Sequence, residues 1–417
     1  MVDFRAFRGL RYTPLGGDLS DLISPPYDVL SAAQVEALKD RSPYNIIRLE
    51  HPVMALAGER EPYEAAASLL NEWQGRGILR RDDAPAFHLH AQTFTEGDHS
   101  RQRRVIYGRL KLTSWDDGEV VPHEYTMAGP KEDRLRLLRA LNANTSPLYL
   151  LYNDSDGDIA SLLPSSAGAG QTLTASADAE SHALTALVEP DTVQRLQTAF
   201  AERRLYMADG HHRYETALAH HNTEGSAETA YVLAGLTASN DPGLSIHATH
   251  RLFSGEFDPR ALRDAIDRDF ELQPVSRAEL KELLSGEELA LGLGGLDSPS
   301  SLVCLRPRNL DSLASRTPGD APEVSRRLDV SLLQHIVLGD YLGLDPAKPD
   351  QAGLVYVHSL DDALDTVANH GARLAFLLRP VSPKQLIEVS DAGARLPQKT
   401  TYFSPKLPTG LVMNLLD

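Results

Sequence analysis

Ala208-Asp209-Gly210-His211-His212-Arg213-Tyr214-Glu215 is the most informative stretch of this chain. The apolar run before it, Arg204-Leu205-Tyr206-Met207, predicts a short buried strand, and Thr216-Ala217-Leu218-Ala219 after it predicts a helix. The polar residues therefore lie at a strand-to-helix turn, where backbone N–H groups and the helix dipole favour an anion. A helix cap formed by Asp209 would explain one polar residue, but this turn carries five. We therefore expect it to bind negatively charged oxygen.

The glycine and the arginine of this turn suit that role. A glycine lets the backbone approach a ligand closely. An arginine holds a phosphate or carboxylate with two parallel hydrogen bonds. Gly210, His211, His212 and Arg213 are accordingly the expected anion contacts.

The apolar pattern around the turn predicts an α/β (α+β) fold with mixed sheets and flanking helices. A helix over 192–202 capped by Asp191, the strand 204–208, the turn, a helix to His221 and a strand over 229–237 form one helix–strand–turn–helix unit followed by a further strand. Other expected helices cover 32–40, 62–73, 132–142, 259–270, 277–284 and 330–342, and other expected strands cover 87–94, 103–112, 148–152, 289–293 and 301–305. A polar stretch over 309–324 predicts a loop.

Three sequence blocks are expected along the chain. The weakest hydrophobic pattern lies between Asp154 and Ser181 and includes a Pro-Ser-Ser-Ala-Gly-Ala-Gly loop at 164–170. We place block boundaries there and near Phe257, which gives residues 1–153, 154–256 and 257–417. The middle block carries the anion-binding turn.

Composition limits the possible partners. The chain has 417 residues, 42% hydrophobic and 24% charged, and a formal net charge of −17. An acidic surface repels nucleic acid and anionic membranes at long range, but a local basic pocket can still hold a small anion. The single cysteine, Cys304, forms no internal disulfide and is expected in the core. With neither a signal peptide nor an apolar span in the sequence, we expect a cytoplasmic protein.

Two further polar clusters are candidates for the same site. Val121-Pro122-His123-Glu124 places an imidazole beside a carboxylate in a loop, and His123 or Glu124 could act as a general base. Lys131 and Arg134 lie near a helix start, where cations oppose the dipole; an exposed charged helix start explains them equally well.

The second cluster is the segment from Pro397 to Lys406, held extended by prolines. Its lysines, Lys399 and Lys406, could complete an anion site, and an edge strand with solvated lysines is the equal alternative.

Other patterns favour simpler interpretations. Asn142–Pro147 reads as a helix C-cap followed by a turn. His247 and His250, with the histidines near the turn, raise the idea of a metal site, but the usual zinc spacings are missing, so we prefer anion contacts for His211 and His212. The sequence has neither a P-loop nor a dinucleotide-binding fingerprint.

Many segments together resemble a prokaryotic family named domain of unknown function 1015. They are Ser24–Val29, Pro43–Leu49, Pro122–Glu124, Pro130–Arg134, Asn144–Pro147, Ala208–Ala217, Leu328–Leu333 and Pro397–Gly410. The order helix, strand, Asp-Gly-His-His-Arg and helix is also similar to the ParB/sulfiredoxin superfamily, which includes ADP-dependent free serine kinases.

The second resemblance implies particular roles. Gly210, His211, His212 and Arg213 would contact nucleotide phosphates, and Asp209 would be a magnesium ligand or a base. No motif matches the separate catalytic glutamate of the kinases, and Glu124 is our choice for it. Mg²⁺ with ADP or ATP would be the cofactor.

The resulting hypothesis is a phosphotransferase that acts on a small polar metabolite such as serine or phosphoserine. A nucleotide- or metabolite-binding regulatory protein without turnover and a phosphoester hydrolase are the alternatives. For the first, we expect Arg213, Glu124 and Lys399 to line one cleft, with Lys131, Arg134 and Lys406 closing it.

Overall fold

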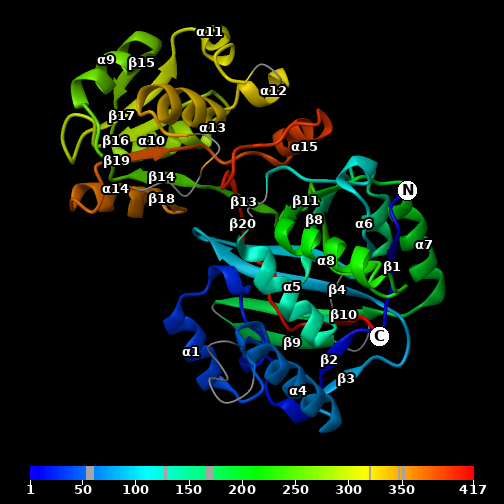
Figure 1. Cartoon of the computed structure of the whole chain (residues 1–417). Coiled ribbons are helices and arrows are strands. Elements are labelled where there is room, and N and C mark those ends of the chain that lie inside the picture. The colour runs from blue at the N-terminus through cyan, green and yellow to red at the C-terminus, as the bar shows by residue number, and fades with distance from the viewer. Residues whose placement is uncertain are drawn as a thin grey trace. The chain divides into compact units, whose positions relative to one another are not determined.

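The computed structural model describes residues 1–52, 61–125, 129–164, 172–177, 179–318, 321–345, 348 and 353–417 (Figure 1). The chain divides into two compact units. Unit 1 comprises Met1–Pro122, Thr126–Leu244 and Pro405–Asp417, and unit 2 comprises His123–Tyr125 and Ser245–Ser404. Of the loop expected at 164–170, all but Pro164 lies outside the described residues. The division into three sequence blocks stays a prediction.

Unit 1 is built on a mixed sheet, as the α/β expectation requires. Its strand order is β6-β11-β8-β12-β5-β4-β10-β9, and β1 also pairs with β5. The strands are β1 (Phe4–Arg5), β4 (Phe87–Glu96), β5 (His99–Lys111), β6 (Val120–Val121), β8 (Leu148–Tyr152), β9 (Thr172–Ala177), β10 (Glu180–Leu187), β11 (Leu205–Asp209) and β12 (Tyr231–Ala238). The pairs β4–β5, β9–β10 and β8–β11 are antiparallel, whereas β8–β12 and β6–β11 are parallel.

The two faces of this sheet differ in chemistry because side chains alternate along a strand. On β4, Phe87 and Leu89 join the hydrophobic core, while His88, His90 and Gln92 point the other way and are also buried. The sheet therefore has one apolar face and one buried polar face.

Helices cover unit 1, and four of them contribute side chains to the core beside the apolar face: α5 (Gly129–Leu141), α6 (Asp158–Leu162), α7 (Pro190–Ala201) and α8 (His211–Glu224). α5 and α8 lie side by side (Figure 1). In the described part of unit 1, the other helices of four or more residues are α1 (Ala32–Arg41), α2 (Ile47–Glu50) and α4 (Pro62–Gly75). Two small ribbons complete the unit, β2 (Leu10–Tyr12) with β3 (Leu79–Arg81) and β7 (Ala143–Asn144) with β21 (Asn414–Leu415).

Local sequence signals explain most helix starts. Ser31 caps α1, because its hydroxyl accepts from Gln34 N while the Gln34 side chain accepts from Ser31 N. The expected cap by Asp191 is wrong: α7 begins at Pro190, and Glu189 occupies the cap position. Proline is favoured at the first helical position because its missing N–H needs no partner there, so Asp191 falls inside the first turn.

Unit 2 has its own sheet, of order β15-β17-β16-β19-β14-β18, and a ribbon of β13 with β20. The strands are β13 (Ser245–Ala248), β14 (His250–Phe253), β15 (Phe270–Pro274), β16 (Leu291–Gly294), β17 (Leu302–Pro307), β18 (Leu354–Val357), β19 (Leu374–Leu377) and β20 (Thr401–Ser404). Cys304 is buried in the core of this unit, as expected.

The helices of unit 2 are α9 (Pro259–Asp269), α10 (Arg277–Ser285), α11 (Leu310–Ala314), α12 (Glu323–Arg326), α13 (Asp329–Leu332), the π-helix η5 (Leu333–Tyr341), α14 (Leu360–Ala368) and α15 (Pro383–Asp391). The helix expected over 330–342 is confirmed, although most of it is π-helical. The expected loop at 309–324 is partly wrong, because Asn309 caps the short α11 through Ser312 N. None of the helices in the described part of the chain has the length and hydrophobicity of a bilayer span.

Candidate anion-binding site

The turn between β11 and α8 has the predicted order of strand, turn and helix. Asp209 ends β11, Gly210 adopts a left-handed conformation with φ +95°, and α8 begins at His211. A Cβ atom on Gly210 would lie 3.0 Å from Leu148 Cδ2 and 3.3 Å from the Arg213 guanidinium. Both the backbone angle and the space therefore require glycine here.

The expected helix cap by Asp209 is wrong. Gly210 occupies the cap position of α8, and the helix start has no side-chain cap. The Asp209 carboxylate instead accepts from Lys406 Nζ at 2.9 Å on Oδ1 and from Arg213 Nη2 at 2.9 Å on Oδ2. Two cations outcompete backbone N–H groups for a carboxylate, because charge-assisted hydrogen bonds are the stronger ones.

These contacts fix the charge state of the turn. Burial by itself would raise the pKa of Asp209, but Lys406 and Arg213 outweigh it and hold that pKa well below its usual range. Burial would lower the pKa of Arg213, and Asp209 outweighs it and keeps the guanidinium charged. Arg213 Nη1 also donates to the carbonyl of Pro147. Asp209 is thus a permanent anion that orients two cations.

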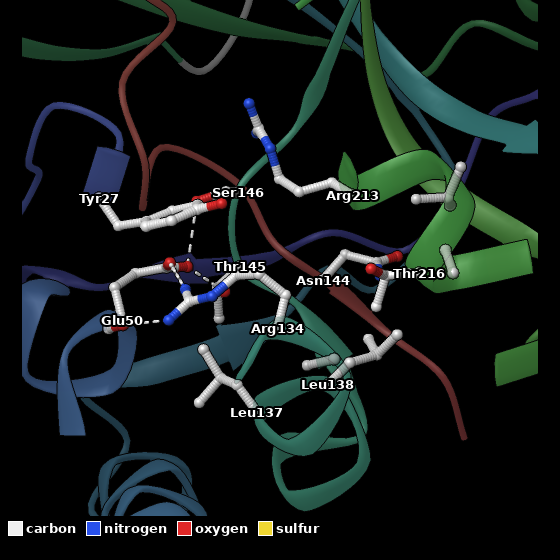
Figure 2. A pocket seen from close by; sticks show the side chains of 13 residues that line it. Tyr27, Glu50, Arg134, Leu137, Leu138, Asn144, Thr145, Ser146, Arg213 and Thr216 are labelled. Carbon is white, nitrogen blue, oxygen red and sulfur yellow. Dashed lines mark hydrogen bonds and ion pairs between the residues drawn. The ribbon is translucent and has the colours of Figure 1, made fainter. Parts of the chain in front are cut away.

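Arg213 lines a cavity of about 50 Å³ within unit 1 (Figure 2). A buried water needs roughly 10–15 Å³ measured in this way, so the cavity has room for one group of the size of a phosphate or carboxylate. Its polar lining residues are Tyr27, Glu50, Arg134, Asn144, Thr145, Ser146, Arg213 and Thr216.

Glu50, at the end of α2, is the carboxylate of this cavity. Its Oε1 accepts from Ser146 Oγ at 3.0 Å and from Thr145 Oγ1, and its Oε2 accepts from Arg134 Nη1 at 3.1 Å. The Tyr27 ring lies over the Arg134 guanidinium, 4.0 Å from Cζ to the ring centre (Figure 2). A second arginine is thereby held rigidly at the cavity wall, with a carboxylate and two hydroxyl groups beside it.

Sequence reasoning missed several of these residues. Tyr27, Glu50 and Thr216 were not candidates, and Thr145 and Ser146 were assigned to a turn between a helix and a strand. The backbone of Asn142, with φ 48°, fits the expected helix end, but the hydroxyl groups that follow bind Glu50. An acidic residue at the end of an apolar helix, Ile46-Ile47-Arg48-Leu49-Glu50, is the one sequence signal that pointed to this carboxylate.

Other candidate residues of unit 1 have mixed placements. His211 is buried and His212 is half-buried at the start of α8. Lys131 forms an ion pair with Glu215 of α8. Arg134 reaches the cavity, whereas Lys131 is not among the cavity-lining residues. The phosphate-binding roles of these residues stay predictions.

His123, Glu124 and Lys399 belong to unit 2. His123 Nε2 lies 2.9 Å from Thr401 Oγ1, and its carbonyl accepts from Leu396 N at 2.7 Å. Glu124 forms a β-bridge with Leu396, and Lys399 has φ 57°. Within unit 2, His123 and Glu124 therefore meet the segment around Lys399, whereas Lys131, Arg134 and Lys406 belong to unit 1. A single cleft that holds Arg213, Glu124 and Lys399 stays a prediction.

A magnesium ion does not fit the carboxylate proposed for it as this site is arranged. Both oxygens of Asp209 already accept from cations, and a divalent ion would meet Lys406 and Arg213 at close range. In the part of the chain that the structure describes, no cluster of three or more acidic, histidine or cysteine side chains could hold a metal.

A cavity lined by two arginines lies beside a glycine turn on a mixed α/β fold. The chain belongs to the family described as Protein of unknown function (DUF1015), whose model matches residues 4–331. This confirms the first resemblance seen in the sequence. A search of curated protein sequences finds no match.

Several solved structures are similar at low identity. A conserved hypothetical protein from Pyrococcus furiosus is 15% identical, with 74% of this chain and 95% of that chain covered and a TM-score of 0.37. A free serine kinase in complex with AMP is 14% identical, with 73% and 92% covered and a TM-score of 0.35. SbnI with a C-terminal truncation, from Staphylococcus aureus, is 12% identical, with 73% and 87% covered and a TM-score of 0.36. At this distance the likeness assigns neither activity nor ligand to this chain.

Proposed function

We propose that the cavity of unit 1 binds the phosphoryl group of a small metabolite or nucleotide, and that the protein transfers this group to a hydroxyl group of a small polar metabolite. Serine is the first acceptor to test. The observation that carries the proposal is that two arginines, Arg134 and Arg213, line one cavity that has room for a single phosphate. Arginine pairs and hydroxyl groups are what stabilise a transferring phosphoryl group.

The polar lining supports an anionic occupant. Thr216 Oγ1 is buried in this lining and has no hydrogen-bond partner among the described residues. A buried hydroxyl group without a partner is costly, so a ligand or water that accepts from it is expected. A phosphate oxygen could accept from Thr216, and the two arginines of the lining make the cavity favourable for its charge.

The same arrangement supplies a proton acceptor for transfer. The acceptor hydroxyl oxygen forms a bond to phosphorus, the bond from phosphorus to the donor oxygen breaks, and the hydroxyl proton passes to the Glu50 carboxylate. Glu50 takes this role because it is the carboxylate that lines the cavity. Glu124 and His123 stay the alternative bases predicted from the sequence, and Asp209 is assigned to orienting Lys406 and Arg213. No step is routed through a metal ion.

Calorimetry with ADP, ATP and phosphoserine, each with and without Mg²⁺, tests binding. The full-length protein should bind at least one of them, and Arg213→Met should weaken that binding at least tenfold. Arg203→Met is the matched control, since Arg203 is a partly buried arginine of unit 1 that pairs with Asp156 and does not line the cavity. Absence of heat with every compound, with the protein folded, contradicts the proposal.

Phosphorus NMR then separates binding from turnover. Under transfer, Glu50→Gln keeps the ligand affinity within a few-fold and abolishes product, whereas Glu124→Gln retains product. Loss of product in Glu124→Gln alone would assign the base to Glu124. Binding without any product favours a regulatory protein, and phosphate release from phosphoserine without nucleotide favours a hydrolase.

A further inference from the structure

The start of the C-terminal segment, Pro405 and Lys406, is fastened to the buried polar face of the unit 1 sheet. Arg103 of β5 donates from Nη2 to the Pro405 carbonyl at 2.6 Å. Gln92 of β4 donates from Nε2 to the Lys406 carbonyl at 3.2 Å. The side chain of Lys406 then reaches Asp209 at 2.9 Å. Two strand residues thus hold the backbone of the lysine that pairs with the turn.

Arg103 and Gln92 also hold each other. They face one another across the β4–β5 pair, and Arg103 Nη2 donates to Gln92 Oε1 at 2.5 Å. Gln92 Nε2 donates to Glu180 as well, at 2.6 Å, and the Arg103 guanidinium lies 5.0 Å from the centre of the Tyr149 ring. Both side chains are fully buried, so neither changes rotamer without disturbing its neighbours.

The fold gains little from a charge at position 103. Arg103 forms no ion pair with any described residue, and its Nε and Nη1 lack hydrogen-bond partners there. A buried charge that is incompletely compensated costs stability, and an apolar side chain of similar volume is often more stable in such a place. The hydrogen bonds that Arg103 makes go to Gln92 and to the Pro405 carbonyl beside Lys406, and its guanidinium also lies over the Tyr149 ring. Its geometry therefore serves the position of that lysine.

We propose that Arg103, together with Gln92, is a positioning residue that places Lys406 on Asp209 and so completes the cationic side of the anion-binding turn. The proposal rests on the proposed function, in which the cavity lined by Arg213 of this turn binds a phosphoryl group. Lysine has a long flexible stem, and its charge is localised only when its backbone is held. A fixed Lys406 shares the Asp209 carboxylate with Arg213, so the cluster of one anion and two cations keeps a net positive charge that favours an incoming anion.

Titration of inorganic phosphate into full-length variants tests this chain of contacts. Lys406→Met and Arg103→Lys should each weaken phosphate binding about tenfold. Because Arg103 acts through Lys406, the double variant should bind no more weakly than Lys406→Met alone. Arg109→Lys is the matched control, because Arg109 lies on the same strand but pairs with Glu228, and it should stay within twofold of the wild type. Wild-type affinity in Arg103→Lys, or effects that multiply in the double variant, overturn the proposal.

A second readout does not depend on ligand binding. Carbon-13 NMR of the Asp209 carboxyl group should show a very low pKa in the wild type and an upward shift of about one unit in Arg103→Lys, because Lys406 drifts from the carboxylate. An unchanged Asp209 titration overturns the positioning role. If wild-type protein binds no phosphate while the shift is seen, the proposed function fails and the positioning stands. Should Arg103→Lys not fold, Gln92→Met removes the other backbone anchor and is read in the same way.

Discussion

Replacement of Asp209 by asparagine should destabilise unit 1 strongly at neutral pH. The variant keeps the shape of the side chain but leaves Lys406 and Arg213, each with 13% of its side chain exposed, without the carboxylate between them. Breaking a buried pair by removal of one partner costs about 3–5 kcal/mol. Since Asp209 retains 21% exposure and water screens part of the charge, we expect a loss of about 2–3 kcal/mol in the free energy of unfolding.

Urea denaturation followed by tryptophan fluorescence measures this loss in the correct unit. The chain has two tryptophans, Trp73 and Trp115, and both lie in unit 1. Trp115 also stacks on Tyr214 of α8, with the ring centres 4.2 Å apart, so its emission reports on the helix that follows the turn. Asp156→Asn is the control, because the Asp156 carboxylate is nearly half exposed beside Arg203, and it should unfold with the wild type.

The pH dependence gives the sign of the effect. The folded-state pKa of Asp209 lies below its unfolded value, which is near 3.9, so the stabilisation is fully present above the unfolded pKa and is lost as pH falls through the folded one. The difference between wild type and Asp209→Asn should therefore be constant from pH 7 to pH 5 and shrink at lower pH. A difference below about 0.5 kcal/mol at pH 7, or one that grows as the solution is acidified, would refute this reasoning.

Three further outcomes follow from local geometry. Gly210→Ala should lose about 1–3 kcal/mol in the same urea assay, because φ is +95° and the new Cβ meets Leu148 at 3.0 Å; wild-type stability would show that the turn is not strained. Tyr214→Phe removes a hydroxyl that donates to the Thr113 carbonyl at 2.8 Å and accepts from Thr113 N at 3.0 Å, and should cost about 1–2 kcal/mol, with no loss if water replaces both contacts. Burial and nearby positive charge lower the pKa of His182 to about 4, so the unfolded state binds more protons than the folded state between pH 6.5 and 4, and stability falls as the pH is lowered through that range. His182→Gln should reduce this fall by roughly 3 kcal/mol. An unchanged pH profile would show that this histidine is protonated in the folded protein.

Short-range patterns predicted much of the fold. A short apolar run, a polar turn and a helical pattern predicted β11 and α8. The predicted ends lie within one to three residues of the observed ones. The cap of α1 is also a local feature, because Ser31 and Gln34 form reciprocal hydrogen bonds within four residues. The caps assigned to Asp191 and Asp209 failed for the opposite reason. Asp191 is not the cap because the proline before it takes the first helical position. Asp209 is not the cap because its carboxylate pairs with Lys406 and Arg213. The local sequence does not show which of these interactions is stronger.

The candidate site shows the same division. Asp209, Gly210 and Arg213 could be predicted from the sequence because they are consecutive or one helical turn apart. Residues so close in the chain must also lie close in space. Glu50 was missed because its partners, Arg134, Thr145 and Ser146, lie 84 to 96 positions further along the chain. A single sequence does not show which residues so far apart will come into contact.

Local pattern was therefore enough to identify an α/β chain with a polar turn at a strand end, since strand, turn and helix preferences act over a few neighbouring residues. The tertiary structure determines which charged side chains pair at that turn. Lys406 reaches Asp209 across 197 positions because strands far apart in the sequence pair into one sheet and bring the C-terminal segment onto its polar face. Long-range pairing, rather than any property of the individual residues, brought Lys406 and Asp209 together as an ion pair.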